Sequence, residues 1–472
     1  MSCSPLYGGV KALLTCDGGE VVSGIVSFVI SQNRVLRLLS RVMRRAGGTP
    51  IATAIILING LRCYLGVSLR GEGDAVMVAR RPNERRAIVQ FMAMAGRSRF
   101  AELAIAWQLR PMWRALAVRA RSLPRDCRRM RRLAGALSRR YGVFHALRVV
   151  ELIAYYSRYL ELIADQQAPA ASSFAQLSLS TTGSPLPRSR EPRTREPANR
   201  EPVRRKERRF RLAVMSTHSN PHGIALNLAA RRRGVPIVLI THGMPIRPLA
   251  RLPYDLAIHE CAASSRIYVE AGCGMERVIV KSRRGDHAPI CPPVAGALTA
   301  GVFLSKDPVD GRVMSCLRAL SSDGRVSRIL VRPHPVNLWR DLPRRLASLG
   351  EPRIVLQAGT SLRDDLRQCD VVIAGNSTVL LDAVVAGRPA CYVRGLDHGA
   401  YDVQDFVRDD LVYEWHAPPP LDLGAIAEYY ARREWPRILR QYADVDRREE
   451  DVAADVRAAL EAIDAAEIGA VA

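Results

Sequence analysis

The stretch DVVIAGNSTVLLDAVVAGRPACYV, residues 370–393, decides the fold class of this chain. Two short apolar runs, 371–374 and 390–393, enclose a polar turn at Gly375 and a helix-like segment that ends at Gly387. Glycine commonly terminates helices, and apolar runs of this length are typical of buried strands. A strand, a helix and a second strand in this order predict a βαβ unit with parallel strands.

The same alternation continues on both sides of this stretch. Apolar runs at 211–215 and 237–240 enclose a helix pattern for which Asn220 is a suitable N-cap. Further strand patterns lie at 328–331 and 353–356, each followed by a helix pattern. We therefore predict an α/β fold with two Rossmann-like, doubly wound domains that face a cleft.

Composition divides the chain into five segments. Arg-Glu-Pro occurs three times within residues 190–202, and proline and charge at this density cannot bury a core. The predicted segments are an Arg-rich, largely helical N-terminal part of the first domain (1–165), a disordered basic linker (166–209), a first Rossmann-like unit (210–300), a second Rossmann-like domain (301–440) and a C-terminal helix (441–472).

The charge balance suggests an anionic partner. The 472 residues include 70 Lys and Arg against 46 Asp and Glu, a formal net charge of +24. A phosphorylated small molecule, an anionic membrane surface and nucleic acid would each satisfy this charge. The linker has no aromatic residue for base stacking before Phe210, which disfavours nucleic acid. An arginine-rich proteome without any specific anion is the alternative.

The cysteine pattern indicates a reducing compartment. The ten cysteines form no CxxC pair, so neither a zinc knuckle nor a disulfide framework is indicated, and no metal is expected.

The N-terminal MSCSPLYGGV lacks the layout of a signal peptide. The apolar window 50–69 is interrupted by polar residues, so we expect buried core there. The pattern at 126–165 predicts a helix whose arginines face either solvent or a membrane. A cytoplasmic protein, with a peripheral membrane location left open, is the expectation.

One strand end of the second domain presents basic groups. The apolar run 328–331 is followed by Arg332, Pro333 and His334. Because Pro333 cannot donate to a sheet ladder, the chain leaves the sheet at this point. Arg332 and His334 should therefore lie at the carboxyl end of a strand, where open α/β sheets bind ligands.

A second strand end in the same sheet carries helix-capping residues. Gly375 allows a tight turn, and Asn376, Ser377 and Thr378 then open a helix whose free N–H groups suit an anion. Asp382 lies one turn into this helix, where it could accept hydrogen bonds from a ribose diol. Together with the neighbouring basic strand end, this predicts a phosphate site; ordinary helix capping is the competing interpretation.

Histidines mark the matching position in the first domain. His242 closes the strand 237–240, and Gly243 beside it allows close backbone approach. Histidine titrates near neutrality, so His242 is a candidate for taking a proton from a hydroxyl; a purely loop-shaping role is the alternative. His218 and His222 flank a helix start in the same layer and are weaker candidates.

Three motifs resemble those of a group of bacterial GT-B transferases that make surface polymers. The motifs are GVPIVLITHG (234–243), VRPHP (331–335) and GNSTVLLDAVVAGRPACYV (375–393). The group comprises the capsule Kdo transferases, the polysialyltransferases and the CDP-glycerol glycerophosphotransferases. The resemblance covers residues 210–408, less than half of the chain.

The resemblance implies roles for individual residues. His334 with its proline, and the pair Ser377 and Thr378, match the group's nucleotide-binding motifs. His242 and Gly243 match the motif on the acceptor side. A CMP-, CDP- or UDP-linked donor in the C-terminal domain, no obligatory metal and an often lipid-linked or anionic polysaccharide acceptor at the inner membrane face are implied as well.

These observations predict a metal-independent glycosyltransferase, or a transferase of polyol-phosphate. Arg332, His334 and residues 376–378 would neutralise the leaving phosphate, Asp382 would hold the ribose, and His242 would be the base. Asp382 departs from the glutamate that such families usually have. The alternatives are a UDP-N-acetylglucosamine 2-epimerase-like enzyme and a non-catalytic protein that binds an anionic glycan or nucleotide.

Overall fold

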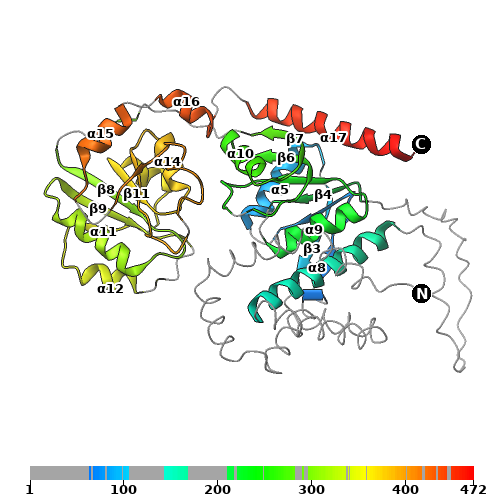
Figure 1. Ribbon diagram of the computed structural model, residues 1–472, viewed down its shortest axis with the longest axis horizontal. Helices are drawn as coiled ribbons and strands as arrows, with labels where there is room; N and C mark the ends of the chain where they lie inside the picture. The colour runs from blue at the N-terminus through cyan, green and yellow to red at the C-terminus, as the bar shows by residue number, and fades with distance from the viewer. Residues whose placement is uncertain are drawn as a thin grey trace, which may run out of the picture.

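The structure, a computed structural model, contains two lobes, each built around a parallel-rich sheet (Figure 1). It describes residues 63–64, 67–79, 82–97, 99–105, 143–167, 210–216, 220–247, 249–281, 290–291, 296–335, 339, 341–357, 359–399, 401–416, 420–431, 434–443 and 448–471. The predicted linker therefore lies outside the described residues, apart from its first two residues, which end a helix.

The first lobe holds a seven-stranded sheet with the order β1-β3-β2-β4-β5-β6-β7. All neighbouring strands are parallel except β1 and β3, which are antiparallel. The strands are β1 (Val67–Arg70), β2 (Ala75–Val78), β3 (Phe100–Ile105), β4 (Leu212–Met215), β5 (Ile237–Ile240), β6 (Tyr254–His259) and β7 (Met275–Val280). The central strands β2, β4 and β5 are buried along their whole length, as parallel strands covered on both faces must be.

The N-terminal region contributes more sheet than its sequence predicted. Beside helices α5 (Pro82–Met94) and α8 (Val143–Gln167), it supplies β1, β2 and β3. These strands are only four to six residues long and lie among arginines, so their pattern is too short to recognise in isolation. The pairing of β2 with β4 makes residues on both sides of the linker parts of one sheet.

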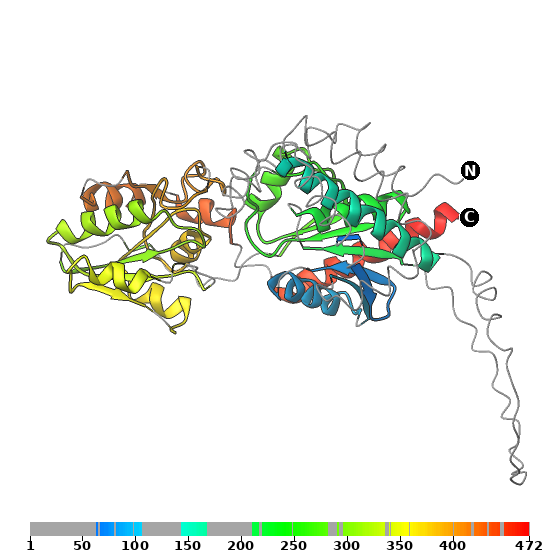
Figure 2. The same cartoon turned by 90° about the horizontal axis from the view of Figure 1, so that it is seen from below.

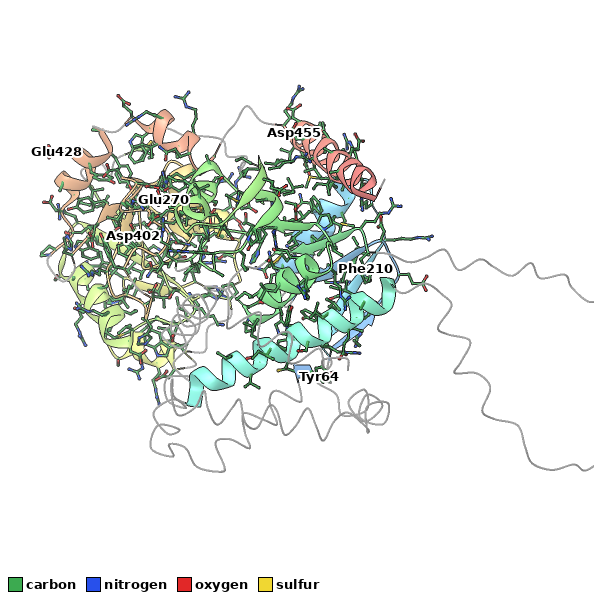
Figure 3. The ribbon with its side chains drawn as sticks, turned by 45° about the vertical axis from the view of Figure 1, so that its right-hand side comes forward. Tyr64, Phe210, Glu270, Asp402, Glu428 and Asp455 are labelled. Atoms are coloured by element: carbon green, nitrogen blue, oxygen red, sulfur yellow. The ribbon has the colours of Figure 1, made fainter. Side chains whose placement is uncertain are left out.

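The predicted basic helix at 126–165 is a core helix where the structure describes it. Every residue from Val150 to Leu160 is buried except Arg158, so this part of α8 has neither a solvated nor a membrane-facing arginine face. In the apolar window 50–69, the described Cys63, Tyr64 and Val67 are buried as expected. Tyr64, labelled in Figure 3, donates a hydrogen bond to Glu161 of α8. No helix in the described part of the chain combines the length and apolarity needed to cross a bilayer.

The second lobe holds a six-stranded parallel sheet with the order β10-β9-β8-β11-β12-β13. Its strands are β8 (Leu298–Phe303), β9 (Val326–Arg332), β10 (Ile354–Leu356), β11 (Val371–Ala374), β12 (Ala390–Tyr392) and β13 (Tyr413–Glu414). The intervening helices are α11 (Asp310–Ser322), α12 (Leu342–Ala347), α13 (Leu362–Arg367) and α14 (Val379–Val385). Strand order reverses between β8 and β11, the arrangement of a doubly wound Rossmann sheet. The predicted α/β fold with two doubly wound domains is confirmed.

Several helices cover the sheets and link the lobes. They are α9 (Pro221–Arg232) and α10 (Ala262–Glu270) in the first lobe, and α15 (Leu423–Ala431) and α16 (Trp435–Arg440) after the second sheet. Asn220 caps α9 as predicted, because its Oδ1 accepts a hydrogen bond of 2.8 Å from the Gly223 N–H.

The C-terminal helix α17 (Glu449–Val471) returns to the first lobe (Figures 1 and 2). Its apolar face, with Val456 and Leu460, joins a core cluster that includes Ile88 of α5 and Ile258 of β6. Arg277 of β7 donates to the Ala459 carbonyl at 3.0 Å. The chain thus crosses from the first lobe to the second and back again.

Truncating this apolar face should destabilise the first lobe. Leu460 is 4% exposed, and Leu460→Ala should cost about 2–5 kcal/mol because buried leucines leave cavities. The exposed neighbour Glu461, changed to Ala, should change stability by no more than about 0.5 kcal/mol. Chemical denaturation measures both values; equal, small effects would show that α17 does not pack here.

Candidate functional site

The point at which the second sheet reverses brings two loops together. The loop after β8 contains Ser305, Lys306 and Asp307, and the loop after β11 begins at Gly375. The buried Ser305 Oγ and Asp307 Oδ2 have no hydrogen-bond partner among the described residues, and Lys306 is exposed. Doubly wound sheets bind ligands at this position. An exposed lysine and two unpartnered polar atoms therefore belong to the loop where a polar ligand is expected.

Sequence reasoning missed this loop after β8. The signal was present: the apolar run Leu298–Phe303 is followed within two residues by the turn-forming sequence Ser-Lys-Asp-Pro. The strand was not assigned because its neighbours along the chain carry no clear pattern.

The predicted anion site after β11 is partly filled by the protein itself. The Asp397 carboxylate accepts hydrogen bonds from the Asn376 N–H (2.7 Å), the Asn376 side chain (3.0 Å) and the Gly399 N–H (2.9 Å). The Asn376 N–H is therefore not available to a ligand phosphate. Ser377 Oγ accepts from the Val379 N–H at 3.3 Å, whereas the Thr378 side chain makes no capping bond. The Thr378 hydroxyl remains for a ligand.

Asp397 also explains Gly375. A Cβ at Gly375 would lie 2.5 Å from Asp397 Oδ2, closer than real Cβ atoms approach, and 3.1 Å from its Cγ, so the carboxylate would have to move. The glycine is thus required by a close approach of the carboxylate, in addition to the turn that the sequence predicted.

The structure does not bring the Arg332 guanidinium to the Asn376 loop. Arg332 forms an ion pair with Asp365, which is 1% exposed, and donates to the Thr360 carbonyl at 3.1 Å. Both partners lie beyond β9 on the β10 side, while β8 separates β9 from β11. The buried Asp365 carboxylate needs a cationic partner, which is the physical reason for this arrangement. His334, two residues beyond the strand, is half-buried.

His242 in the first lobe is held by one ring nitrogen. Its Nδ1 lies 3.0 Å from the Ser216 carbonyl oxygen and 2.8 Å from the Ser216 hydroxyl. A carbonyl oxygen can only accept, so a hydrogen bond to it requires the tautomer with the proton on Nδ1, in which Nε2 is the ring nitrogen that can accept. Around Gly243, a Cβ would meet no atom within 4 Å. The geometry leaves a half-buried imidazole with open space beside it at Gly243.

The weaker histidine candidates are not part of this arrangement. His222 is 3% exposed, with its Nδ1 3.2 Å from the Tyr159 hydroxyl and its ring tilted against that of Tyr155 at 3.8 Å between ring centroids. It packs α9 against α8 and does not face the acceptor side, because the helix turns it into the core. His218 lies outside the described residues. Asp382 lies half-buried on α14.

Charged residues that sequence reasoning did not single out lie beside His242. Glu260 follows β6 and Lys281 follows β7; Lys281 Nζ is 2.9 Å from Glu260 Oε1 and 3.1 Å from the Thr241 carbonyl oxygen. The sequence signal for Glu260 and Lys281 was their place directly after β6 and β7, at the ends of two strands.

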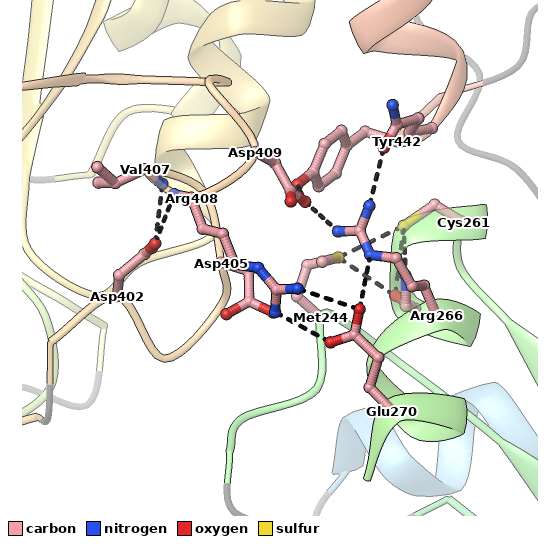
Figure 4. A network of polar contacts seen from close by, with 12 residues as sticks. Met244, Cys261, Arg266, Glu270, Asp402, Asp405, Val407, Arg408, Asp409 and Tyr442 are labelled. Atoms are coloured by element: carbon pink, nitrogen blue, oxygen red, sulfur yellow. Dashed lines mark hydrogen bonds and ion pairs between the residues drawn. The ribbon is translucent and has the colours of Figure 1, made fainter.

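A network of ion pairs joins the lobes beside these loops (Figure 4). We call it the cross-lobe network; its members are Arg247, Arg266 and Glu270 of the first lobe and Asp405, Arg408 and Asp409 of the second. Arg247 lies 3.0 Å from Asp405, and Arg408 lies 2.9 Å from Glu270. Hydrogen bonds from Arg408 and Arg247 lower the pKa of Glu270.

The loop that carries Asp405 has an unusual backbone. Asp402, Asp405 and Asp410 have positive φ values of 43°, 59° and 58°, and no other non-glycine residue in the described ranges does. Aspartate tolerates this conformation better than most residues. The Val403 N–H donates to Asn376 Oδ1 at 3.1 Å, and its carbonyl accepts from the Arg247 N–H at 3.3 Å. The loop thus connects the switch point of one lobe to the His242 loop of the other.

Gly375→Ala should destabilise the second lobe by about 1–3 kcal/mol, the usual cost of overpacking, because its Cβ would collide with Asp397. Gly243→Ala is the matched control and should cost less than about 0.5 kcal/mol, since open space surrounds it. Thermal and chemical denaturation compare the two variants. Equal costs would contradict the assigned close approach.

Arg247→Ala should loosen the association of the lobes by about 1–3 kcal/mol, because it removes charged hydrogen bonds to Asp405 and Glu270. Small-angle scattering should show a larger radius of gyration, more so at high salt.

The folded-state pKa of Glu270 is depressed. The contribution of this carboxylate to the stability of the lobe contact is therefore present above the usual glutamate range, near pH 4.3, and is lost as pH falls through the lowered pKa.

The control for this experiment is Arg345→Ala, whose partner Asp341 lies within the second lobe at 2.8 Å. It should leave the radius of gyration unchanged. If Arg247→Ala behaves like this control at every salt concentration, the cross-lobe network does not hold the lobes together in solution.

Comparison with known proteins gives fold similarity only. No family model matches the chain, and no curated protein matches it. The structure resembles the pneumococcal O-GlcNAc transferase GtfA solved with UDP and GlcNAc (11% identity, TM-score 0.29, 53% of each chain). It also resembles a putative UDP-N-acetylglucosamine 2-epimerase from Listeria monocytogenes (10%, TM-score 0.40, 82% of this chain and 96% of that one). A third similar structure is that of the calicheamicin glycosyltransferase CalG4 (17% identity, TM-score 0.35, 56% of this chain and 76% of that one).

The chain spans about half the length of the pneumococcal enzyme. The structures to which this chain is similar thus include glycosyltransferases and a 2-epimerase. The narrower resemblance to capsule Kdo transferases, polysialyltransferases and CDP-glycerol glycerophosphotransferases stays a prediction.

Proposed function

We propose that this protein transfers a glycosyl or polyol-phosphate group from a nucleotide-activated donor to a hydroxyl of a surface polysaccharide or lipid-linked precursor. The observation that carries the proposal is a chain of hydrogen bonds between the loop after β5 in the first lobe and the loop after β11 in the second. His242, whose Nδ1 faces the Ser216 carbonyl, lies in the loop that ends at Arg247, and Arg247 contacts the loop bonded to Asn376. A base and a ligand-binding switch point are therefore joined across the lobes.

The second lobe would bind the donor. Lys306 supplies a cation for its phosphates, and the Thr378 hydroxyl supplies a donor group. His334 would approach the same phosphates from the end of β9, and Asp382 would accept from the ribose diol. The unpartnered Asp307 Oδ2 is suited to accept from a sugar hydroxyl. Arg332 is replaced by Lys306 as the cation, since Asp365 already neutralises Arg332.

The first lobe would activate the acceptor. In the reaction, the acceptor oxygen forms a bond to the donor carbon or phosphorus, and the bond to the leaving nucleotide phosphate breaks with its electron pair. The hydroxyl proton passes to Nε2 of His242. Fixed charges and hydroxyls stabilise the leaving phosphate in this proposal, without an obligatory metal. The net charge of +24 suits an anionic acceptor and work at the inner membrane face from the cytoplasm.

A 2-epimerase-like reaction is the second candidate. It requires a carboxylate that can move a proton at the sugar, and Asp307, with an unpartnered Oδ2 in the loop at the switch point, is the candidate for that role.

Nucleotides should stabilise the protein in a thermal-shift screen with CMP, CDP, UDP, UMP and GDP. A ligand at about 100 times its Kd adds about 2.7 kcal/mol. Lys306→Ala and His334→Ala should lose this stabilisation. Arg318→Ala, which removes an exposed charge from α11, should keep it. His242→Ala should also keep it, while transfer to acceptor falls by about 10²–10⁴-fold.

The outcomes separate the candidates. Nucleotide release that needs a polysaccharide acceptor supports transfer. Isomerised nucleotide-sugar without acceptor would identify an epimerase, and binding without either would identify a binding protein. Absence of stabilisation by every nucleotide would remove the donor site from the second lobe.

A further inference from the structure

Three charged or polar residues meet where neighbouring strands of the first sheet end. Thr241 follows β5, Glu260 follows β6 and Lys281 follows β7. The strands are parallel and in register, with Ile240 opposite Ile258 and His259 opposite Val280. Their next residues consequently lie along one edge of the sheet, and His242 follows directly after Thr241.

Thr241 is fixed to β6 through both its backbone and its side chain. Its N–H donates to the Ile258 carbonyl at 2.9 Å, and its hydroxyl donates to the same oxygen at 3.2 Å. The hydroxyl also accepts from the Glu260 N–H at 3.1 Å. Thr241 is buried, so these bonds are shielded from water.

Lys281, which follows β7, adds a contact to the Thr241 peptide from the opposite side of β6. Its Nζ donates to the Thr241 carbonyl at 3.1 Å and pairs with Glu260 Oε1 at 2.9 Å. Strands lie about 4.8 Å apart, so the lysine side chain passes over the end of β6 to reach β5. Both side chains of the pair are 18% exposed.

The Thr241 carbonyl belongs to the planar peptide that joins Thr241 to His242. Its direction therefore sets the position from which the imidazole extends. His242 is anchored at its ring by Ser216 and at its preceding peptide by Lys281.

We propose that Lys281, held by Glu260, is a positioning residue that directs the His242 imidazole. A partly buried ion pair adds little net stability by itself, so orientation of the Thr241 peptide is its principal contribution. Lys281 does not touch the reacting atoms; it acts through the peptide that carries His242. The catalytic consequence of this role rests on the proposed function, whereas the orientation of the imidazole does not.

The first test reads the His242 ring directly. The full chain is labelled with ¹⁵N/¹³C-histidine, and the His242 resonances are identified by their loss in His242→Gln. The wild type should show the tautomer protonated on Nδ1. Lys281→Met should produce a mixture of tautomers, and Lys281→Arg should restore the wild-type signature, because arginine can also donate to the Thr241 carbonyl and pair with Glu260. Arg231→Met, an exposed charge at the end of α9, is the control and should change nothing.

The second test uses kinetics. If transfer is measurable, Lys281→Met should lower kcat by about 10–100-fold with little change in KM, and Lys281→Arg should recover most of the rate. Should Lys281→Met fail to fold, Glu260→Gln serves instead, because it releases the ammonium from its partner beside Thr241. A His242 spectrum that stays the same in the folded variants overturns the proposal. A changed spectrum without transferase activity for any nucleotide would leave the positioning role intact and reject the proposed function.

Discussion

The cross-lobe network is the interaction on which the arrangement of the candidate site depends. Each sheet would exist without it, because each is closed by its own apolar cluster. The contacts of Arg247 with Asp405, and of Arg408 with Glu270, join the two lobes beside an apolar cluster to which both lobes contribute, with Ile267 from the first and Phe406 from the second. Charged hydrogen bonds of this kind are strong enough to hold a geometry and weak enough to respond to salt. The contact between the lobes therefore holds its geometry and also responds to salt.

The second lobe shows how a protein can use part of its own anion site. Asp397 satisfies the Asn376 N–H and side chain and excludes any Cβ at Gly375. The same asparagine accepts from Val403, so the switch-point loop is tied to the backbone that reaches the first lobe. What remains for a ligand is a different set: the Lys306 ammonium, the Thr378 hydroxyl and the unpartnered oxygens of Ser305 and Asp307. The sequence motif after β11 thus supplies internal support at the proposed donor site.

Much of the fold was predictable because it follows from local pattern. The βαβ units around 211–240 and 328–393 were readable, since apolar runs and capping residues such as Asn220 act over a few neighbours. The strands β1 to β3 were not, because four to six residues among arginines carry too little periodicity. The return of α17 to the first lobe was also hidden: an amphipathic helix specifies an apolar face but not the surface that it covers.

For the candidate site, the sequence by itself determined which residues stand at strand ends: Arg332, His334, His242 and residues 376–378. Strand ends in parallel sheets share one edge, so that placement needs no tertiary information. Tertiary structure decided their partners. It paired Arg332 with a buried carboxylate 33 positions away, turned His222 into the core and put Lys281 against the peptide of His242. Side-chain direction depends on which unsatisfied charge or carbonyl lies within reach, and only the packed chain decides that.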